Sequence, residues 1–281
     1  MKHEHDEGFG RCPYTTWPDL FRESRTVRYE VLRTGDVKVK TSLALNLRSP
    51  RAAGMTNETQ WVGVDIVAVT HPDGRVFLLD AGLDSSYQRK PTGRVRGLLS
   101  GSIATGRQEA GQSAAEQLGP RTADLAGILF THLHFDHIAG ACELPSAGRY
   151  VCGPHEKPDR YPLIFTNDYL SEIGPVERMP EDTGPGIPPF GGVVDVLGDR
   201  SIWAIPTPGH SRGSVSYLFR TENGMRLFVG DACMKVGVEQ GIGPGDYSAD
   251  RALAETTMFK IAEFARENPE VEIIYAHEFV E

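Results

Sequence analysis

The stretch Thr131-His132-Leu133-His134-Phe135-Asp136-His137 places three imidazoles and one carboxylate within six residues. Neutral imidazole is the commonest side-chain metal ligand, and carboxylate oxygens complete many such sites. An apolar run at residues 125–130 comes directly before the cluster and reads as a short buried strand. Polar groups are costly next to a buried strand unless they bind a partner. The stretch therefore predicts a metal site at the end of this strand.

Three later apolar runs lead to further histidine or aspartate residues. Residues 201–205, 225–229 and 271–276 each read as a strand, and they are followed by His210, Asp231 and His277. Ligand sites in layered α/β folds are built at the ends of strands. We therefore expect these three residues to converge on the histidine cluster.

The number of candidate ligands predicts two metal ions. His132 and His134 are two residues apart and would point the same way in extended backbone, whereas Asp136 and His137 lie past the strand. With the three later residues the total is seven: His132, His134, Asp136, His137, His210, Asp231 and His277. This exceeds the four ligands of one tetrahedral zinc, and it suits two adjacent ions that share a carboxylate.

The order of these motifs resembles that of the metallo-β-lactamase superfamily, from about Trp61 to the C-terminus. The run at residues 132–140 is similar to the form in N-acyl homoserine lactone lactonases. The resemblance implies an α/β fold, an αβ/βα sandwich of two related halves with the metal site at one edge of the sheets. We expect residues 1–60 to be an N-terminal extension packed on the core and residues 61–281 to be the metallo-β-lactamase-like domain, one structural domain overall.

The resemblance also implies roles for individual residues. One metal would be held by His132, His134 and His210, the other by Asp136, His137 and His277, with Asp231 as the bridge. Asp80 matches an early aspartate of the family that orients a ligand. The two divalent ions would most simply be zinc, although the donor set also accepts iron, manganese or cobalt. Hydroxide between them would attack a lactone or ester, and Asp136 would pass a proton to the leaving alkoxide.

One position departs from the lactonase pattern. These enzymes carry a tyrosine three residues after the bridging aspartate, where this chain has Met234. A thioether cannot donate a hydrogen bond. Either Tyr169, Tyr217 or Tyr247 takes over that role, or the substrate is different.

Composition limits the partners. Lys plus Arg number 29 and Asp plus Glu 38, which gives a net charge of −9 and disfavours nucleic acid and anionic membranes. The sequence contains no apolar stretch near the roughly 18 residues of a membrane helix, and no apolar signal core at the N-terminus. We therefore expect a cytoplasmic protein, a monomer or homodimer, whose partner is a small acyl lactone or ester.

Other functions remain open on the residues alone. A phosphodiesterase of the same superfamily would need a phosphate site, for which Arg94, Arg96 and Arg107 are candidates. A β-lactam or thioester hydrolase, an iron-dependent oxidoreductase such as a persulfide dioxygenase, and a non-catalytic metal-binding protein are further alternatives. For a lactonase, an acyl pocket has seven candidate lining residues, which are Leu98, Leu99, Ile103, Leu163, Ile164, Phe165 and Phe190.

Overall fold

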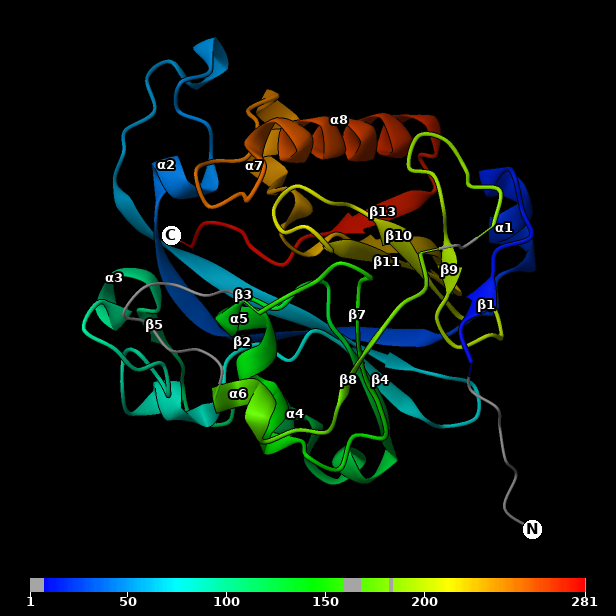
Figure 1. The fold of residues 1–281 in the computed structure, drawn as a ribbon, viewed down its shortest axis with the longest axis horizontal. Coiled ribbons are helices and arrows are strands. Elements are labelled where there is room, and N and C mark those ends of the chain that lie inside the picture. The colour runs from blue at the N-terminus through cyan, green and yellow to red at the C-terminus, as the bar shows by residue number, and fades with distance from the viewer. Residues whose placement is uncertain (1–7, 159–167, 182–183, 281) are drawn as a thin grey trace.

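A computed structural model describes residues 8–158, 168–181 and 184–280. Two mixed β-sheets lie face to face, with helices on their outer sides (Figure 1). The larger sheet has seven strands in the order β5-β2-β3-β4-β6-β7-β8. Its strands are β2 (Arg28–Lys40), β3 (Thr59–Thr70), β4 (Val76–Leu79), β5 (Gly106–Arg107), β6 (Leu125–Leu129), β7 (Tyr150–Cys152) and β8 (Val176–Arg178).

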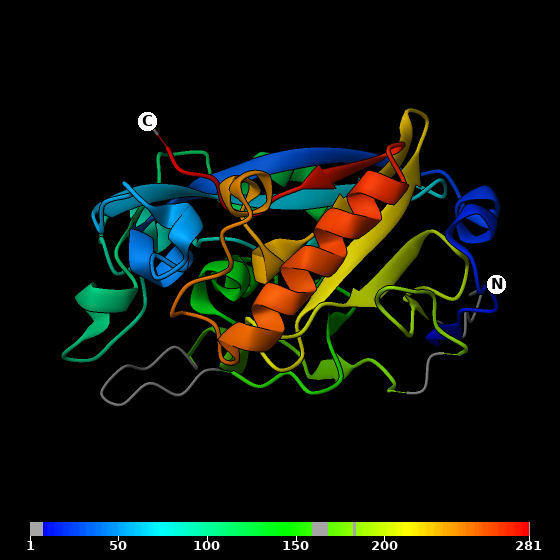
Figure 2. The same cartoon turned by 90° about the horizontal axis from the view of Figure 1, so that it is seen from above.

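The second sheet has six strands in the order β1-β9-β10-β11-β12-β13. Its strands are β1 (Gly10–Arg11), β9 (Val194–Asp195), β10 (Ile202–Pro206), β11 (Val215–Thr221), β12 (Gly224–Phe228) and β13 (Val271–Ile274). The helices are α1 (Trp17–Glu23), α2 (Thr41–Ala44), α3 (Ser100–Ile103), α4 (Ala114–Leu118), α5 (Phe135–Ile138), α6 (Asp168–Ser171), α7 (Lys235–Gln240) and α8 (Arg251–Glu267). Helix α8 crosses the outer face of this sheet (Figure 2), whereas α4, α5 and α6 lie on the side of the larger sheet (Figure 1).

The central strands β4, β6, β10 and β11 are apolar on both faces because both of their faces are covered. In β4, Phe77 and Leu79 pack into the core between the sheets, and Val76 and Leu78 pack under the helices of the larger sheet. Strands buried on both faces read as continuous apolar runs, as here, rather than as alternating patterns. The predicted αβ/βα sandwich is therefore confirmed.

Several predicted elements have different bounds in the structure. Residues 27–32 and 37–45 read as two strands, but β2 runs unbroken to Lys40 and α2 follows it. A bulge between Arg33 and Asp36 carries the strand across the polar interruption, and Arg33 pairs with Asp65 on β3. Strand β11, in the middle of its sheet, was not predicted from the sequence.

The long helix α8 begins directly after its N-cap, Asp250. The side chain of Asp250 accepts a hydrogen bond from the amide of Leu253. Met258, Ile261 and Phe264 pack on the sheet, whereas Leu253 is 39% exposed. Among the described residues, no helix combines the length and apolar character that crossing a membrane requires.

Candidate metal centre

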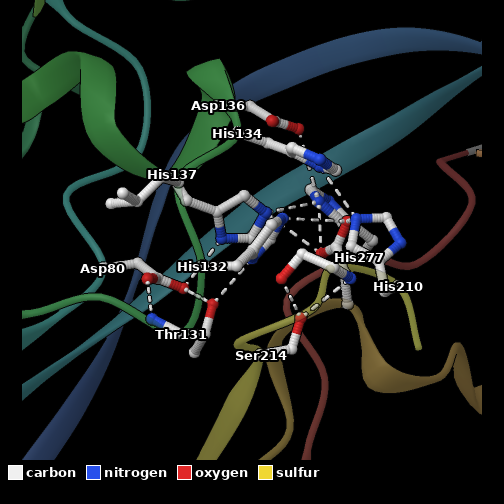
Figure 3. A network of polar contacts seen from close by, with 12 residues as sticks. Asp80, Thr131, His132, His134, Asp136, His137, His210, Ser214 and His277 are labelled. Atoms are coloured by element: carbon white, nitrogen blue, oxygen red, sulfur yellow. Dashed lines mark hydrogen bonds and ion pairs between the residues drawn. The ribbon is translucent and has the colours of Figure 1, made fainter. Parts of the chain in front are cut away.

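The seven predicted ligands form two adjacent groups of side chains. Figure 3 labels six of them, which are His132, His134, Asp136, His137, His210 and His277. The loop after β6 and the first turn of α5 carry four of the seven, and the loops after β10, β12 and β13 carry one each. Both sheets therefore contribute, because β6 belongs to the larger sheet and the other three strands to the smaller one. Their roles as metal ligands stay a prediction, which the geometry of the site supports.

The first group consists of His132, His134, His210 and Asp231. Nε2 of His210 lies 2.8 Å from Nδ1 of His134 and 3.1 Å from Oδ2 of Asp231. Nε2 of His132 lies 3.8 Å from the same carboxylate oxygen. Three ring nitrogens and one oxygen thus face a common centre.

The second group consists of Asp136, His137 and His277. The Nε2 atoms of His137 and His277 are 3.2 Å apart, and Oδ2 of Asp136 lies 3.5 Å from the latter. Oδ1 of Asp231 lies 3.0 Å from Nε2 of His137 and 3.1 Å from Nε2 of His277. Asp231 therefore turns one oxygen toward each group.

This arrangement fits two tetrahedral or near-tetrahedral ions. Two nitrogens bound to one zinc are separated by about 3.3 Å, given bonds of about 2.05 Å. The nitrogen–nitrogen distances within the two groups, 2.8 and 3.2 Å, lie below but near this value. In the described part of the chain, the buried Nε2 of His132 has no hydrogen-bond partner. An unpartnered buried nitrogen that faces other ligand atoms is expected where a metal binds.

Hydrogen bonds behind the ligands fix their ring orientations. Nδ1 of His277 lies 2.6 Å from the carbonyl oxygen of Gly63, which directs its Nε2 into the site. Oδ2 of Asp80 lies 2.8 Å from Nδ1 of His137, and the amide of Thr131 donates to Oδ1 of Asp80 (Figure 3). Such contacts select the tautomer of a metal-binding histidine.

The electrostatics of the site favour bound cations. Burial lowers the pKa of His132 well below its usual range and that of His210 to about 3, so both rings are neutral and offer a lone pair. Burial also opposes the charge of Asp231, but His277 and His137 outweigh this and hold the pKa of Asp231 well below its usual range. The carboxylate consequently stays charged at the centre of the cluster. Against the lowering effect of burial, Asp231 in turn raises the pKa of His137 well above its usual range and that of His277 to about 9, so binding of a cation would release protons from these two rings.

A cavity that opens to solvent lies over the ligands. One wall is apolar and includes Val37, Leu43, Ile103 and Met234. No lysine or arginine lines it among the described residues. The three predicted phosphate-site residues, Arg94, Arg96 and Arg107, are absent from this lining. Arg94 forms an ion pair with Glu172. Arg107 forms an ion pair with Asp36 and lies over the ring of Trp61.

The predicted acyl-pocket residues are scattered. Of the seven, Ile103 lines the cavity. Leu98 and Leu99 are 87% and 48% exposed, and Phe190 packs on Trp17 and Phe264. The remaining three, Leu163, Ile164 and Phe165, lie outside the described residues.

The three candidate tyrosines also differ in position. The hydroxyl of Tyr217 donates to the carbonyl of Phe130, and that of Tyr169 accepts from the amide of Arg94. Only Tyr247, of these three, lines the cavity. Its backbone amide donates to the carbonyl of Leu43 over 3.0 Å, which holds its loop against α2.

Comparisons with known proteins agree with this architecture. A family model for the Metallo-beta-lactamase superfamily matches residues 59–277. The N-acyl homoserine lactonase AttM of Agrobacterium fabrum is 26% identical over 210 residues, 72% of this chain and 74% of the relative. The Cytochrome P450 monooxygenase mpaDE of Penicillium roqueforti is 27% identical over 180 residues, 58% of this chain. The chain spans about a fifth of the length of that curated relative, because the match covers only 21% of it.

A solved structure extends the likeness to nearly the whole chain. AidC, described as a dizinc quorum-quenching lactonase in complex with a product, has a TM-score of 0.61 and 14% sequence identity. The match covers 97% of this chain and 92% of AidC. At this level of identity the likeness shows a shared fold.

Proposed function

The chain belongs to the metallo-β-lactamase superfamily, and we propose that it is a metal-dependent hydrolase that opens lactone or ester bonds at a dinuclear centre. The observation that carries the proposal is the position of Asp231, with one carboxylate oxygen toward each histidine group. A shared carboxylate between two adjacent ligand sets is the expected arrangement for a pair of divalent ions. Zinc is favoured because imidazole and carboxylate are its usual ligands and because AidC is a dizinc protein.

Asp231 and Asp136 would have different roles in the proposed hydrolysis. Bound ions would lower the pKa of water so that hydroxide is available near neutral pH, and would polarise a carbonyl. Asp231 would fix the position of the two ligand sets relative to each other, with one carboxylate oxygen toward each. Asp136, which is 8% exposed and lines the cavity, would take up the proton of the hydroxyl group added to the carbonyl carbon and pass it to the leaving alkoxide.

We assign Tyr247 as the hydrogen-bond donor to the substrate carbonyl. It lines the cavity together with the ligands, whereas the hydroxyls of Tyr169 and Tyr217 are engaged elsewhere. Burial raises the pKa of Tyr247 to about 12, so its hydroxyl keeps the proton that a donor needs. A donor directed at the oxygen that gains charge lowers the barrier to acyl transfer.

The cavity wall favours an uncharged substrate with an apolar tail. Its described lining combines aliphatic side chains with the acidic Asp136 and Asp231 and offers no lysine or arginine to an anion. The anionic group of a phosphodiester or of a carboxylate-bearing β-lactam would therefore depend on the proposed metal ions alone for a cationic partner. An acyl lactone fits, in agreement with the activity named for AttM and AidC.

A substrate panel tests the proposal. Protein with its metal content measured would be assayed on acyl homoserine lactones with short and long chains, a bis-aryl phosphate, a cephalosporin and an acyl thioester. We expect lactone opening, and loss of that activity in Asp231→Asn. Cleavage of the phosphate with no lactone opening would contradict the substrate assignment. An iron-loaded protein with no hydrolytic activity would favour an oxidoreductase instead.

A further inference from the structure

Glu156 is a buried carboxylate that lies outside the seven predicted ligands. It follows β7 in the segment Gly153-Pro154-His155-Glu156 and is 1% exposed. A charged group at this depth requires several hydrogen-bond donors or a cation. Arg178 donates to the backbone carbonyl of Glu156, at 3.3 and 3.4 Å, and this contact leaves the carboxylate to other partners.

The carboxylate accepts hydrogen bonds from two separate segments. Its Oε1 accepts from the amide of Leu133, over 3.2 Å, and Leu133 lies between His132 and His134. Its Oε2 accepts from the amide of Gly213, over 2.9 Å, and from the hydroxyl of Ser211, which directly follows His210. One side chain therefore joins the loop after β6 to the loop after β10.

The backbones of Glu156 and the His210 loop are in close contact. A Cβ atom on Gly213 would lie 2.3 Å from the backbone nitrogen of Glu156, and a Cβ on Gly153 would lie 1.9 Å from the carbonyl oxygen of Gly213. Glycine at both positions is what permits this approach. The contact is therefore built into the two loops.

The segments that Glu156 joins carry the three histidines of the first group. The second group has its own orienting atoms, since Asp80 contacts His137 and the carbonyl of Gly63 contacts His277. Asp80 also reaches the first group, because it accepts from the hydroxyl of Thr131, which lies 3.0 Å from Nδ1 of His132. Atoms that orient metal ligands typically change metal affinity by about 10- to 100-fold when they are removed. Among the described residues, the hydrogen bonds of the Glu156 carboxylate go only to Leu133, Ser211 and Gly213, next to histidines of the first group, so a change at Glu156 should act on the first position.

We propose that Glu156 is a positioning residue that fixes His132 and His134 relative to His210, and so sets the metal affinity of the first position alone. This inference rests on the proposed dinuclear centre. The histidines come from opposite sheets, and a carboxylate that accepts from both loops holds them at ligand spacing before any ion binds. Glutamine in its place would keep the size of the side chain. Its NH₂ group would face a hydrogen-bond donor of one of the two loops, so the hydrogen bonds to that loop would be lost.

The test compares Glu156→Gln with wild type and with Glu181→Gln, a change at a glutamate whose side chain is 73% exposed. Metal-free proteins would be titrated with Co²⁺ and Zn²⁺. We expect two ions per wild-type chain; in Glu156→Gln, one ion should bind about 10- to 100-fold more weakly and the other unchanged. Hydrogen exchange of the Leu133 and Gly213 amides in the metal-free protein should also become faster. Glu181→Gln should match wild type in both measurements.

Ser211→Ala provides a second variant in case Glu156→Gln does not fold. It removes one of the three donors, so we expect about a tenfold loss at one position. The inference would be overturned if folded Glu156→Gln matched wild type in both metal affinity and amide exchange. It would also be overturned if Ser211→Ala bound both ions as tightly as wild type does. A wild-type chain that binds fewer than two ions would instead contradict the proposed dinuclear centre, and the exchange rates would still decide whether Glu156 joins the loops.

Discussion

Asp80 and His137 form a fully buried pair in which Oδ2 of the carboxylate lies 2.8 Å from Nδ1 of the imidazole. The same oxygen accepts from the hydroxyl of Thr131. Asp80 adopts a φ of 63°, a left-handed conformation that few residues other than glycine and asparagine or aspartate tolerate. Backbone strain retained at such a position indicates that the placement of its side chain matters.

Asp80→Asn tests the role of this pair. Asparagine tolerates the positive φ and retains one carbonyl acceptor, but it loses the charge that orients His137. We expect the second metal position to bind about 10- to 100-fold more weakly. The loss at the first position should be smaller, because Asp80 reaches His132 only through the hydroxyl of Thr131. Co²⁺ titration followed by its visible spectrum measures both positions. Unchanged affinity at both would show that Asp80 is not needed for ligand orientation.

His134→Ala should lose metal and activity together. The variant removes a ring nitrogen that faces His210 at 2.8 Å, and it leaves the first position with two histidines. We expect about one ion per chain by elemental analysis and loss of lactone opening. His155→Ala is the matched control, because the side chain of His155 is 59% exposed and lies outside both groups. Two ions per chain in His134→Ala would refute the ligand assignment.

Tyr247→Phe should lower kcat more than it changes KM. Loss of one donor to a developing oxyanion typically costs about 10²- to 10³-fold in kcat, whereas the ring that lines the cavity remains. The hydroxyl of Tyr169 bonds the amide of Arg94 outside the cavity wall, so Tyr169→Phe should leave kcat near that of wild type. Steady-state kinetics on an acyl lactone separates the two. If Tyr247→Phe had the same kcat as wild type, a group other than Tyr247 would donate to the substrate carbonyl.

The convergence of the seven candidate ligands was more predictable than their surroundings. Four of them within six residues, and three strand ends with His or Asp, were enough to predict that these side chains lie together. Glu156 also follows a strand, but β7 is only three residues long, too short for a periodicity signal. The choice among the three tyrosines depended on the hydrogen bonds of their hydroxyls. Tyr217 lies on β11, and its hydroxyl donates to the carbonyl of Phe130, which directly follows β6 of the other sheet. Such long-range contacts have no local sequence pattern.

The remaining prediction concerns the pH dependence of folding through Asp195 on β9. This side chain is 4% exposed, and its Oδ1 has no hydrogen-bond partner in the described part of the chain. Burial raises the pKa of Asp195 from 3.8 to about 6. The folded state therefore binds more protons than the unfolded state between these values, and the stability due to this group falls as pH rises from about 4 to about 6.

Asp195→Asn removes this titration and retains an acceptor for the amide of Arg200, which donates to Oδ2 of Asp195 over 2.8 Å. Relative to the variant, wild type should lose roughly 2–3 kcal/mol of unfolding free energy between pH 4 and pH 7. Urea unfolding of metal-free proteins across this range measures the difference, and other titrating groups cancel because both proteins share them. The unfolding free energy of Asp124→Asn, a change at an exposed position, should depend on pH in the same way as that of wild type. Parallel curves for Asp195→Asn as well would show that Asp195 ionises normally in the folded protein.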